Sequence, residues 1–93
     1  MIGSFKCKET EKIFSRQFSR KLPTDIQIVA FRKLRMLNRS STIQDLRVPP
    51  DNRLEALSDK RKGQHGIRIN QQWRLCFVWK DGSAHEVEIV DYH

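Results

Sequence analysis

The chain has 93 residues, a length that predicts a single domain over residues 1–93. Apolar residues make up 38% and charged residues 31%, which is typical of a packed globule and excludes a wholly disordered chain. The 18 Lys and Arg residues outnumber the 11 Asp and Glu residues, so the formal net charge is +7. This excess indicates a polyanionic partner, which could be nucleic acid, an acidic protein or an anionic membrane surface.

Two further patterns narrow the class of protein. No run of 18 apolar residues is present, and residues 1–6 lack an apolar segment, so we expect neither a bilayer-spanning helix nor a secretory signal. The two cysteines, Cys7 and Cys76, lie far apart in the chain. We therefore expect reduced thiols, no zinc site and a cytoplasmic protein.

The N-terminal part of the chain predicts a short strand and then a helix. Residues 2–7 alternate loosely between apolar and polar types. Thr10 is a possible N-cap for a helix over residues 10–18, in which Phe14 and Phe18 share a face.

The clearest helix is predicted over residues 24–39. Thr24 and Gln27 have capping-box spacing, and apolar residues recur with the 3.6-residue period of an amphipathic helix. The stripe consists of Ile26, Ala30, Leu34 and Leu37. A short turn from Ser41 through Leu46 and a proline-containing loop at residues 47–52 follow.

After this loop the apolar period changes to two, which is typical of β-strands. The expected strands are residues 53–57, 67–69, 73–79 and 85–92, and three-residue turns at 70–72 and 81–83 join the last three. The order of elements predicts an α+β fold in two layers, with an N-terminal strand and helices packed on an antiparallel β-meander.

A turn with an odd number of residues pairs odd-numbered residues with odd-numbered residues across a hairpin. Both predicted turns have three residues, so the odd-numbered apolar residues of these strands would share one face. The other face would then carry Arg68 directly across from Arg74, with Tyr92 one diagonal step from Arg74. Two opposed guanidiniums repel unless an anion lies between them, so one interpretation is a clamp for a phosphodiester. The alternative is neutralisation by an acidic neighbour, for which the candidates are Glu55, Glu86 and Glu88.

Two further groups have both a functional and a structural interpretation. The basic run at residues 60–66, which includes Lys60, Arg61 and Lys62, could follow an RNA backbone or could form a solvated loop. The C-terminal group consists of Asp91, Tyr92 and His93. It offers side chains for acid–base catalysis but could equally be a frayed chain end.

The second half of the chain resembles a known family. The pattern Ile-Arg-Ile-Asn-x-x-Trp-Arg at residues 67–74, an apolar strand after it and Asp-Tyr-His at residues 91–93 are similar to the HigB, or plasmid-maintenance killer, branch of the RelE-type toxins. The segments at residues 1–5 and 53–57 also fit. The resemblance implies a RelE-like microbial RNase fold and a ribosome-dependent endoribonuclease that cleaves messenger RNA in the A site. It further implies inhibition by a helix-turn-helix antitoxin of the HigA type.

The same resemblance implies roles for individual residues. Asp91, Tyr92 and His93 match the family's C-terminal catalytic group, Arg68 and Arg74 match its phosphate-facing strand arginines, and Lys60, Arg61 and Lys62 match its basic loop. Glu55 stands where some members have a histidine, so the general base is either Glu55 or His93. The expected reaction needs no metal or cofactor, because the attacking 2′-hydroxyl belongs to the substrate. A non-catalytic RNA- or ribosome-binding module and a ribosome-independent ribonuclease remain the alternatives.

Overall fold

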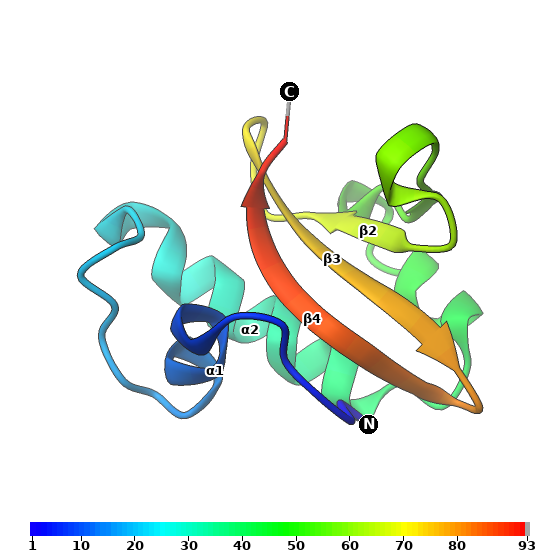
Figure 1. Cartoon of the computed structure of the whole chain (residues 1–93), viewed down its shortest axis with the longest axis horizontal. Coiled ribbons are helices and arrows are strands. Elements are labelled where there is room, and N and C mark those ends of the chain that lie inside the picture. The colour runs from blue at the N-terminus through cyan, green and yellow to red at the C-terminus, as the bar shows by residue number, and fades with distance from the viewer. Residues whose placement is uncertain (93) are drawn as a thin grey trace.

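The computed structural model describes residues 1–92, which form an antiparallel sheet covered on one face by helices (Figure 1). Within these residues the sheet has the order β1-β2-β3-β4. The strands are β1 (Glu55–Ala56), β2 (His65–Arg68), β3 (Trp73–Lys80) and β4 (Ser83–Asp91). The α-helices are α1 (Lys8–Phe14) and α2 (Thr24–Arg39), and the 3-10 helices are η1 (Ile43–Arg47), η2 (Pro50–Asn52) and η3 (Asp59–Arg61). The predicted two-layer α+β fold is confirmed.

Helix α2 supplies the apolar face that covers the sheet. Its predicted stripe is buried, and Ala30, Leu34 and Leu37 are fully inaccessible to solvent. These side chains pack with Ile67, Leu75 and other residues of β2, β3 and β4 in one core cluster. Burying each large aliphatic side chain contributes about 1.5–3 kcal/mol, so the 3.6-residue period of this stripe fixes which side of α2 meets the sheet.

The predicted capping box at the start of α2 is wrong. Thr24 is already helical and Pro23 occupies the N-cap. The side chain of Gln27 instead accepts a hydrogen bond from the Ser19 amide (3.1 Å) and donates to the carbonyl oxygens of Ser19 (2.8 Å) and Leu22 (3.0 Å). Through these hydrogen bonds Gln27 holds the loop that precedes α2 in place, and it does not cap the helix.

The first helix is shorter than predicted and begins earlier. It spans Lys8–Phe14, so Phe18 lies beyond its end and is 61% exposed. Thr10 is not an N-cap, because it is fully buried inside the helix and its hydroxyl accepts a hydrogen bond from the Ile89 amide at 2.9 Å. This contact ties α1 to β4.

The predicted N-terminal strand is reduced to two isolated parallel bridges, Ile2 with Ala84 and Phe5 with Val87. The segment runs beside β4 at the edge of the sheet (Figure 1). Gly3 allows this approach, since a Cβ atom there would lie 2.6 Å from the His85 ring.

The central register is as predicted: Arg68 pairs with Arg74, and Arg74 pairs with Val90. The turn between β3 and β4 differs from the predicted three-residue turn. It has two residues, Asp81 and Gly82, both with positive φ (53° and 76°), and it pairs even-numbered with odd-numbered residues. A β-bulge in the paired stretch before Val87, where Glu86 has a φ of 52°, restores equal parity. Val87 and Ile89 consequently face the core as expected.

Other boundaries moved by a few residues. The strand predicted at 53–57 is paired only at Glu55–Ala56, and β2 begins at His65. The turn predicted from Ser41 is η1, which follows Thr42, and the Asp45 carboxylate accepts the amide hydrogens of Ser41 and Thr42. Within residues 1–92, no helix combines the length and the apolar character needed to cross a bilayer.

Candidate functional site

Two arginines lie directly opposite each other on the sheet face that α2 does not cover. They are Arg68 on β2 and Arg74 on β3, and their neighbours Ile67 and Leu75 point into the core. The side chain of Arg74 is only 14% exposed, and its Nη1 lies 3.2 Å from Oε1 of Glu55. Glu55 reaches this position because β1 pairs with β2. Among the acidic neighbours considered from the sequence, the structure therefore selects Glu55 as the partner of Arg74.

The opposed arginines are incompletely satisfied. The Nε atom of Arg68 is buried and makes no hydrogen bond within residues 1–92. Nη1 of Arg74 also lacks a partner in hydrogen-bond geometry, although it is within ion-pair distance of Glu55. Buried donors without acceptors are costly, and an oxyanion between the two side chains would supply acceptors.

Tyr92 completes one side of this arrangement. The guanidinium carbon of Arg74 lies 5.0 Å from the centre of the Tyr92 ring, which is cation–π distance. The Tyr92 amide donates a hydrogen bond to the carbonyl oxygen of Gln72 (2.8 Å), and Nε2 of Gln72 donates to Oδ2 of Asp91 (3.0 Å). The chain is therefore tied to the β2–β3 turn through Tyr92 and is not frayed there. His93 lies outside the described residues.

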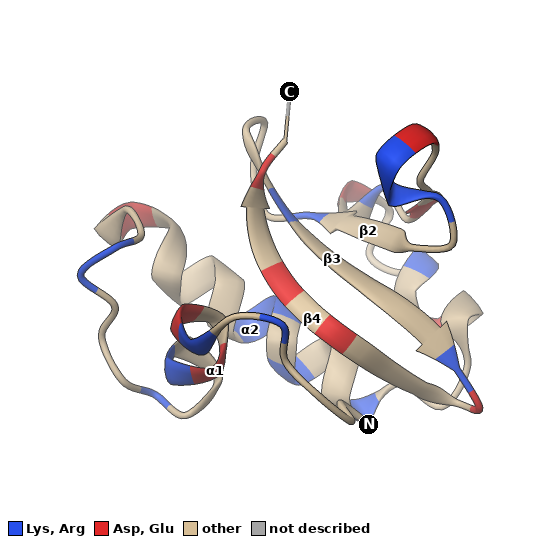
Figure 2. Ribbon diagram, viewed as in Figure 1, with Lys and Arg blue, Asp and Glu red and all other residues tan. Residues whose placement is uncertain are grey.

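In the basic run, Arg61 is held by an ion pair, whereas Lys60 and Lys62 are exposed. Arg61 of η3 lies 2.9 Å from Oε1 of Glu88 on β4, and Lys6 lies 3.8 Å from the same atom. The hydrogen bond to Glu88 raises the pKa of Arg61, and the same contact holds the η3 loop against the sheet. Lys60 and Lys62 are exposed and make no ion pair within the described part of the chain. Figure 2 shows this basic segment beside β2.

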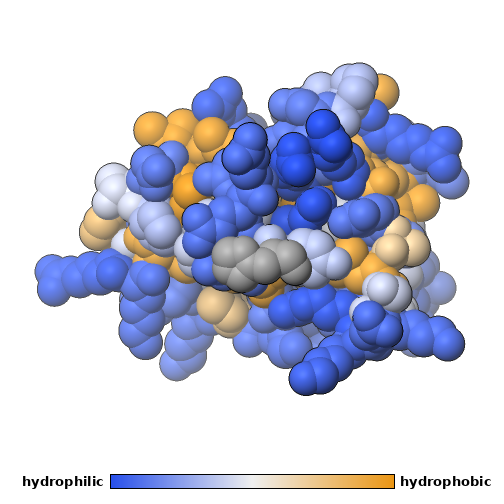
Figure 3. Space-filling view, turned by 90° about the horizontal axis from the view of Figure 1, so that it is seen from above, coloured by the Kyte–Doolittle hydropathy of each residue, from blue (hydrophilic) through white to orange (hydrophobic). Residues whose placement is uncertain are grey.

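A hollow of about 540 Å³ adjoins Tyr92. Its walls come from η3 and the residue before it, and the lining residues are Ser58, Asp59, Lys60, Arg61 and Tyr92. Figure 3 looks onto this side of the molecule, and its surface is predominantly hydrophilic. The hollow is therefore a recess lined mainly by charged and hydroxyl-bearing side chains, and Tyr92 connects it to the paired arginines.

The structure thus brings together five of the residues proposed from the sequence: Glu55, Arg68, Arg74, Arg61 and Tyr92. Lys60 lines the adjoining hollow, whereas Asp91 is exposed and held by Gln72. Within residues 1–92, no three His, Cys, Asp or Glu side chains are grouped so that they could hold a metal ion. The cluster of Arg68, Arg74 and Tyr92 can bind and neutralise an anion.

Comparison with known proteins decides the family. A family model described as the RelE-like toxin of the type II toxin–antitoxin system HigB matches residues 3–93. The chain belongs to this HigB-like toxin family. It is 42% identical to Toxin HigB-1 of Vibrio cholerae over 85 residues, which cover 90% of either chain. The family predicted from the sequence is confirmed.

Solved structures show that the fold of this HigB-like toxin is RelE-like. A YafQ variant from E. coli superposes with a TM-score of 0.63 at 11% identity, covering 98% of this chain and 93% of that one. The YoeB–YefM complex from Staphylococcus aureus gives a TM-score of 0.61 at 14% identity, covering 100% and 98%. At these identities the likeness concerns the fold alone.

Sequence reasoning missed two contributors to the site of this toxin. Lys6 lies near the Glu88 carboxylate that pairs with Arg61, and Gln72 holds Asp91 and Tyr92. Glu88 was a candidate from the sequence as a neighbour of the strand arginines, and the structure pairs it with Arg61 instead. Nothing in the sequence indicates that the η3 loop folds back over the face that carries these arginines.

Proposed function

We propose that this HigB-like toxin is an endoribonuclease that cleaves messenger RNA in the ribosomal A site and so inhibits translation. The observation that carries the proposal is the cross-strand pair Arg68 and Arg74 beside the Tyr92 ring. Nε of Arg68 lacks a hydrogen-bond acceptor, and Nη1 of Arg74 lies at ion-pair distance from Glu55 but outside hydrogen-bond geometry. A bridging phosphodiester would satisfy these donors. Family membership supports the same activity.

The proposed reaction is attack of a ribose 2′-hydroxyl on the adjacent phosphorus. A base removes the hydroxyl proton, the new P–O bond forms, and the bond to the 5′-oxygen breaks after that oxygen gains a proton. Arg68 and Arg74 would stabilise the additional negative charge of the phosphorane-like transition state. The products are a 2′,3′-cyclic phosphate, which water can open to a 3′-phosphate, and a 5′-hydroxyl. No metal is required to generate the nucleophile, because the substrate provides it.

The base in this proposal is Glu55 or His93, and Tyr92 orients the reacting group. Glu55 is 46% exposed on its side chain and lies against Arg74, so its carboxylate is within reach of a phosphate bound to that arginine. Asp91 would position the chain end through its hydrogen bond with Gln72. Lys60 and Lys62 would contact the phosphates of messenger or ribosomal RNA, with Arg61 fixing their loop.

The open hollow favours positioning of the substrate by the ribosome. It is lined by one aromatic ring and by polar and charged side chains, with no enclosed pocket for a base. Proximity and alignment supplied by the translating ribosome would then account for much of the rate. We also propose that a helix-turn-helix antitoxin of the HigA type neutralises the toxin.

The test is cleavage of a defined messenger RNA in a purified translation system, with mapping of the cut site and of its end groups. We expect cleavage in the A site, loss of at least about a hundredfold in rate for Arg74→Ala, and little change for Arg20→Ala, an exposed arginine on the far loop. Equal cleavage of naked RNA would identify a ribosome-independent ribonuclease. Undiminished translation arrest by Tyr92→Ala with His93→Ala would identify a non-catalytic binding module.

A further inference from the structure

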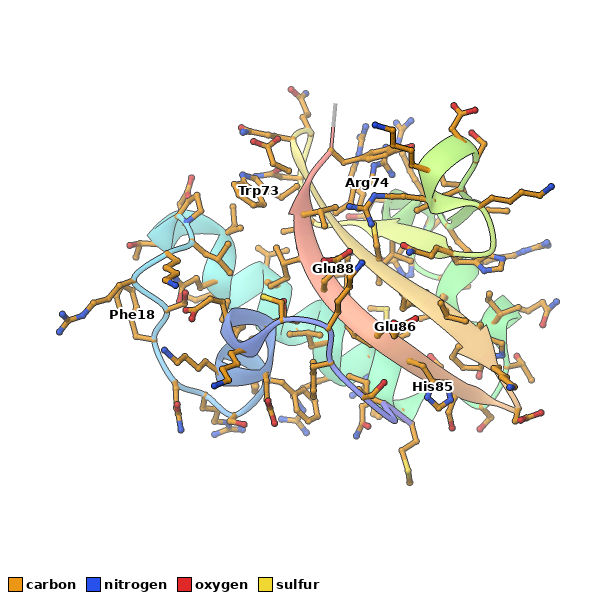
Figure 4. The ribbon with its side chains drawn as sticks, viewed as in Figure 1. Phe18, Trp73, Arg74, His85, Glu86 and Glu88 are labelled. Carbon is orange, nitrogen blue, oxygen red and sulfur yellow. The ribbon has the colours of Figure 1, made fainter. Side chains whose placement is uncertain are left out.

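An apolar hollow lies on the helical layer, away from the arginines described above. It has a volume of about 500 Å³ and is formed by the end of α1, the loop before α2 and the outer side of α2. Its rim carries large apolar side chains that are exposed to solvent: Phe18 is 61% exposed and Ile28 is 70% exposed. Phe31, which also lines the hollow, is partly buried against the core. Figure 4 shows Phe18 and Arg74 on well-separated parts of the molecule.

The exposure of Phe18 is built into a fixed loop. The next residue, Ser19, is fully buried and its hydroxyl donates to Oε1 of Glu9 at 2.6 Å. Gln27 holds the main chain of Ser19 from both sides, as an acceptor for its amide and a donor to its carbonyl oxygen. These hydrogen bonds fix the main chain beside Phe18. The aromatic side chain is therefore presented from an ordered loop, which reduces the backbone entropy lost on docking.

Arginines line the hollow and its continuation along α2. The guanidinium carbons of Arg16 and Arg35 lie 5.2 and 5.9 Å from the centre of the Phe31 ring. A second hollow of about 390 Å³ continues from Phe31 along α2 and is lined also by Arg32, Arg35, Met36 and Arg39. Within the described residues, every charged side chain that lines either hollow is an arginine. We name the two hollows together the α2 groove.

We infer that the α2 groove docks an acidic amphipathic helix of the antitoxin; the inference rests on the antitoxin partner proposed above. Apolar side chains of the partner would fill the hollow at Phe18 and Ile28, and its carboxylates would pair with the arginines. From Ile28 to Arg39 the groove follows about 16 Å of helix, which matches about three turns of a docked helix. A second copy of this toxin is a poor occupant, since it would bring the same arginines face to face.

The experiment measures binding of the wild-type toxin and its variants to the proposed helix-turn-helix antitoxin, by titration calorimetry. We expect Phe18→Ser and Ile28→Lys each to weaken binding by at least about tenfold. Val48→Lys is the matched control, because Val48 is also β-branched, is 71% exposed and lies outside the groove. Its affinity should remain within about twofold of wild type.

Charge is tested with a second matched pair. Arg35→Glu should weaken binding more at low salt than at high salt, whereas Arg47→Glu, an exposed arginine in η1, should not. Wild-type affinity in Phe18→Ser and Ile28→Lys would overturn the inference, as would equal weakening by Val48→Lys. Loss of binding to anionic phospholipid vesicles with unchanged antitoxin affinity would assign the groove to a membrane surface instead. The groove lies away from the paired arginines, so messenger RNA cleavage by these variants should match that of the wild type. If the wild type does not cleave messenger RNA, the proposed function is wrong, but the binding measurements still test the groove.

Discussion

The paired strand arginines should reduce the stability of the folded protein, and this cost can be measured. Like charges directly opposed on neighbouring strands cost about 0.2–1 kcal/mol. The low exposure of Arg74 (14%) places this pair toward the upper end, while Glu55 at 3.2 Å offsets part of the repulsion. We therefore expect Arg68→Gln to raise the free energy of unfolding by about 0.5 kcal/mol. In a domain of this size that raises the melting temperature by about 2–4 °C.

The carboxylate allows a double-mutant cycle. Glu55→Gln should lower the free energy of unfolding by about 1 kcal/mol, a moderate loss because water screens its half-exposed side chain. Without Glu55 the repulsion is no longer offset, so Arg68→Gln should stabilise the Glu55→Gln protein by about 1 kcal/mol, roughly twice its effect in the wild type.

Urea and thermal unfolding followed by circular dichroism would supply the four free energies, with Arg20→Gln as a control for removal of an exposed cation. Arg68→Gln should also abolish messenger RNA cleavage, so the variant would be more stable and inactive. If Arg68→Gln destabilises both backgrounds, or changes them equally, then the two guanidiniums do not repel and our account of the site is wrong.

Three other predictions concern the core and its polar groups. Leu34→Ala should lower the free energy of unfolding by about 2–5 kcal/mol in urea titrations, because Leu34 is fully buried, whereas Ile28→Ala on the outer side of α2 should change it by less than about 0.5 kcal/mol. Burial lowers the pKa of Lys33, so the folded state releases this proton at lower pH than the unfolded state. The wild type should therefore gain stability relative to Lys33→Met as the pH rises toward the ordinary pKa of lysine, about 10.4, and a constant difference would contradict this. Burial also raises the pKa of the Cys76 thiol, so iodoacetamide at pH 8 should label Cys7 first and Cys76 only on unfolding, as read by mass spectrometry.

The sequence predicts best those features that depend on a regular period. Helix α2 has the predicted bounds because its apolar stripe repeats every 3.6 residues and leaves one way to meet the sheet. The pairing of Arg68 with Arg74 follows from alternation in β2 and β3. The turn after β3 was predicted with the wrong length because two arrangements give the same final parity. One is a three-residue turn, and the other is the observed two-residue turn followed by a bulge at Glu86, a residue that carries no turn signal.

The candidate site was predictable where strands carry it and not where a loop does. The alternation of residues along the strands predicts that Arg74 and Tyr92 are neighbours, and in the structure the guanidinium carbon of Arg74 lies 5.0 Å from the centre of the Tyr92 ring. The path of η3 depends on the contact between Arg61 and Glu88, which are 27 positions apart, so no local pattern could reveal that Arg61 is fastened while Lys60 is exposed. The sequence offered Glu55 as one of three acidic neighbours, and only the pairing of β1 with β2 decides among them.

The division between strand and loop also has a consequence for how the proposed chemistry is organised. Main-chain pairing fixes the separation of Arg68 and Arg74 before any substrate arrives, so these donors need little rearrangement to receive a phosphate. Lys60 and Lys62 lie instead on a loop that the ion pair between Arg61 and Glu88 holds against the sheet. Charge that stabilises a transition state requires fixed geometry, whereas charge that attracts a long polyanion acts over about 8–10 Å and tolerates movement. The fold of this toxin places each kind of cation on the element whose rigidity suits its proposed role.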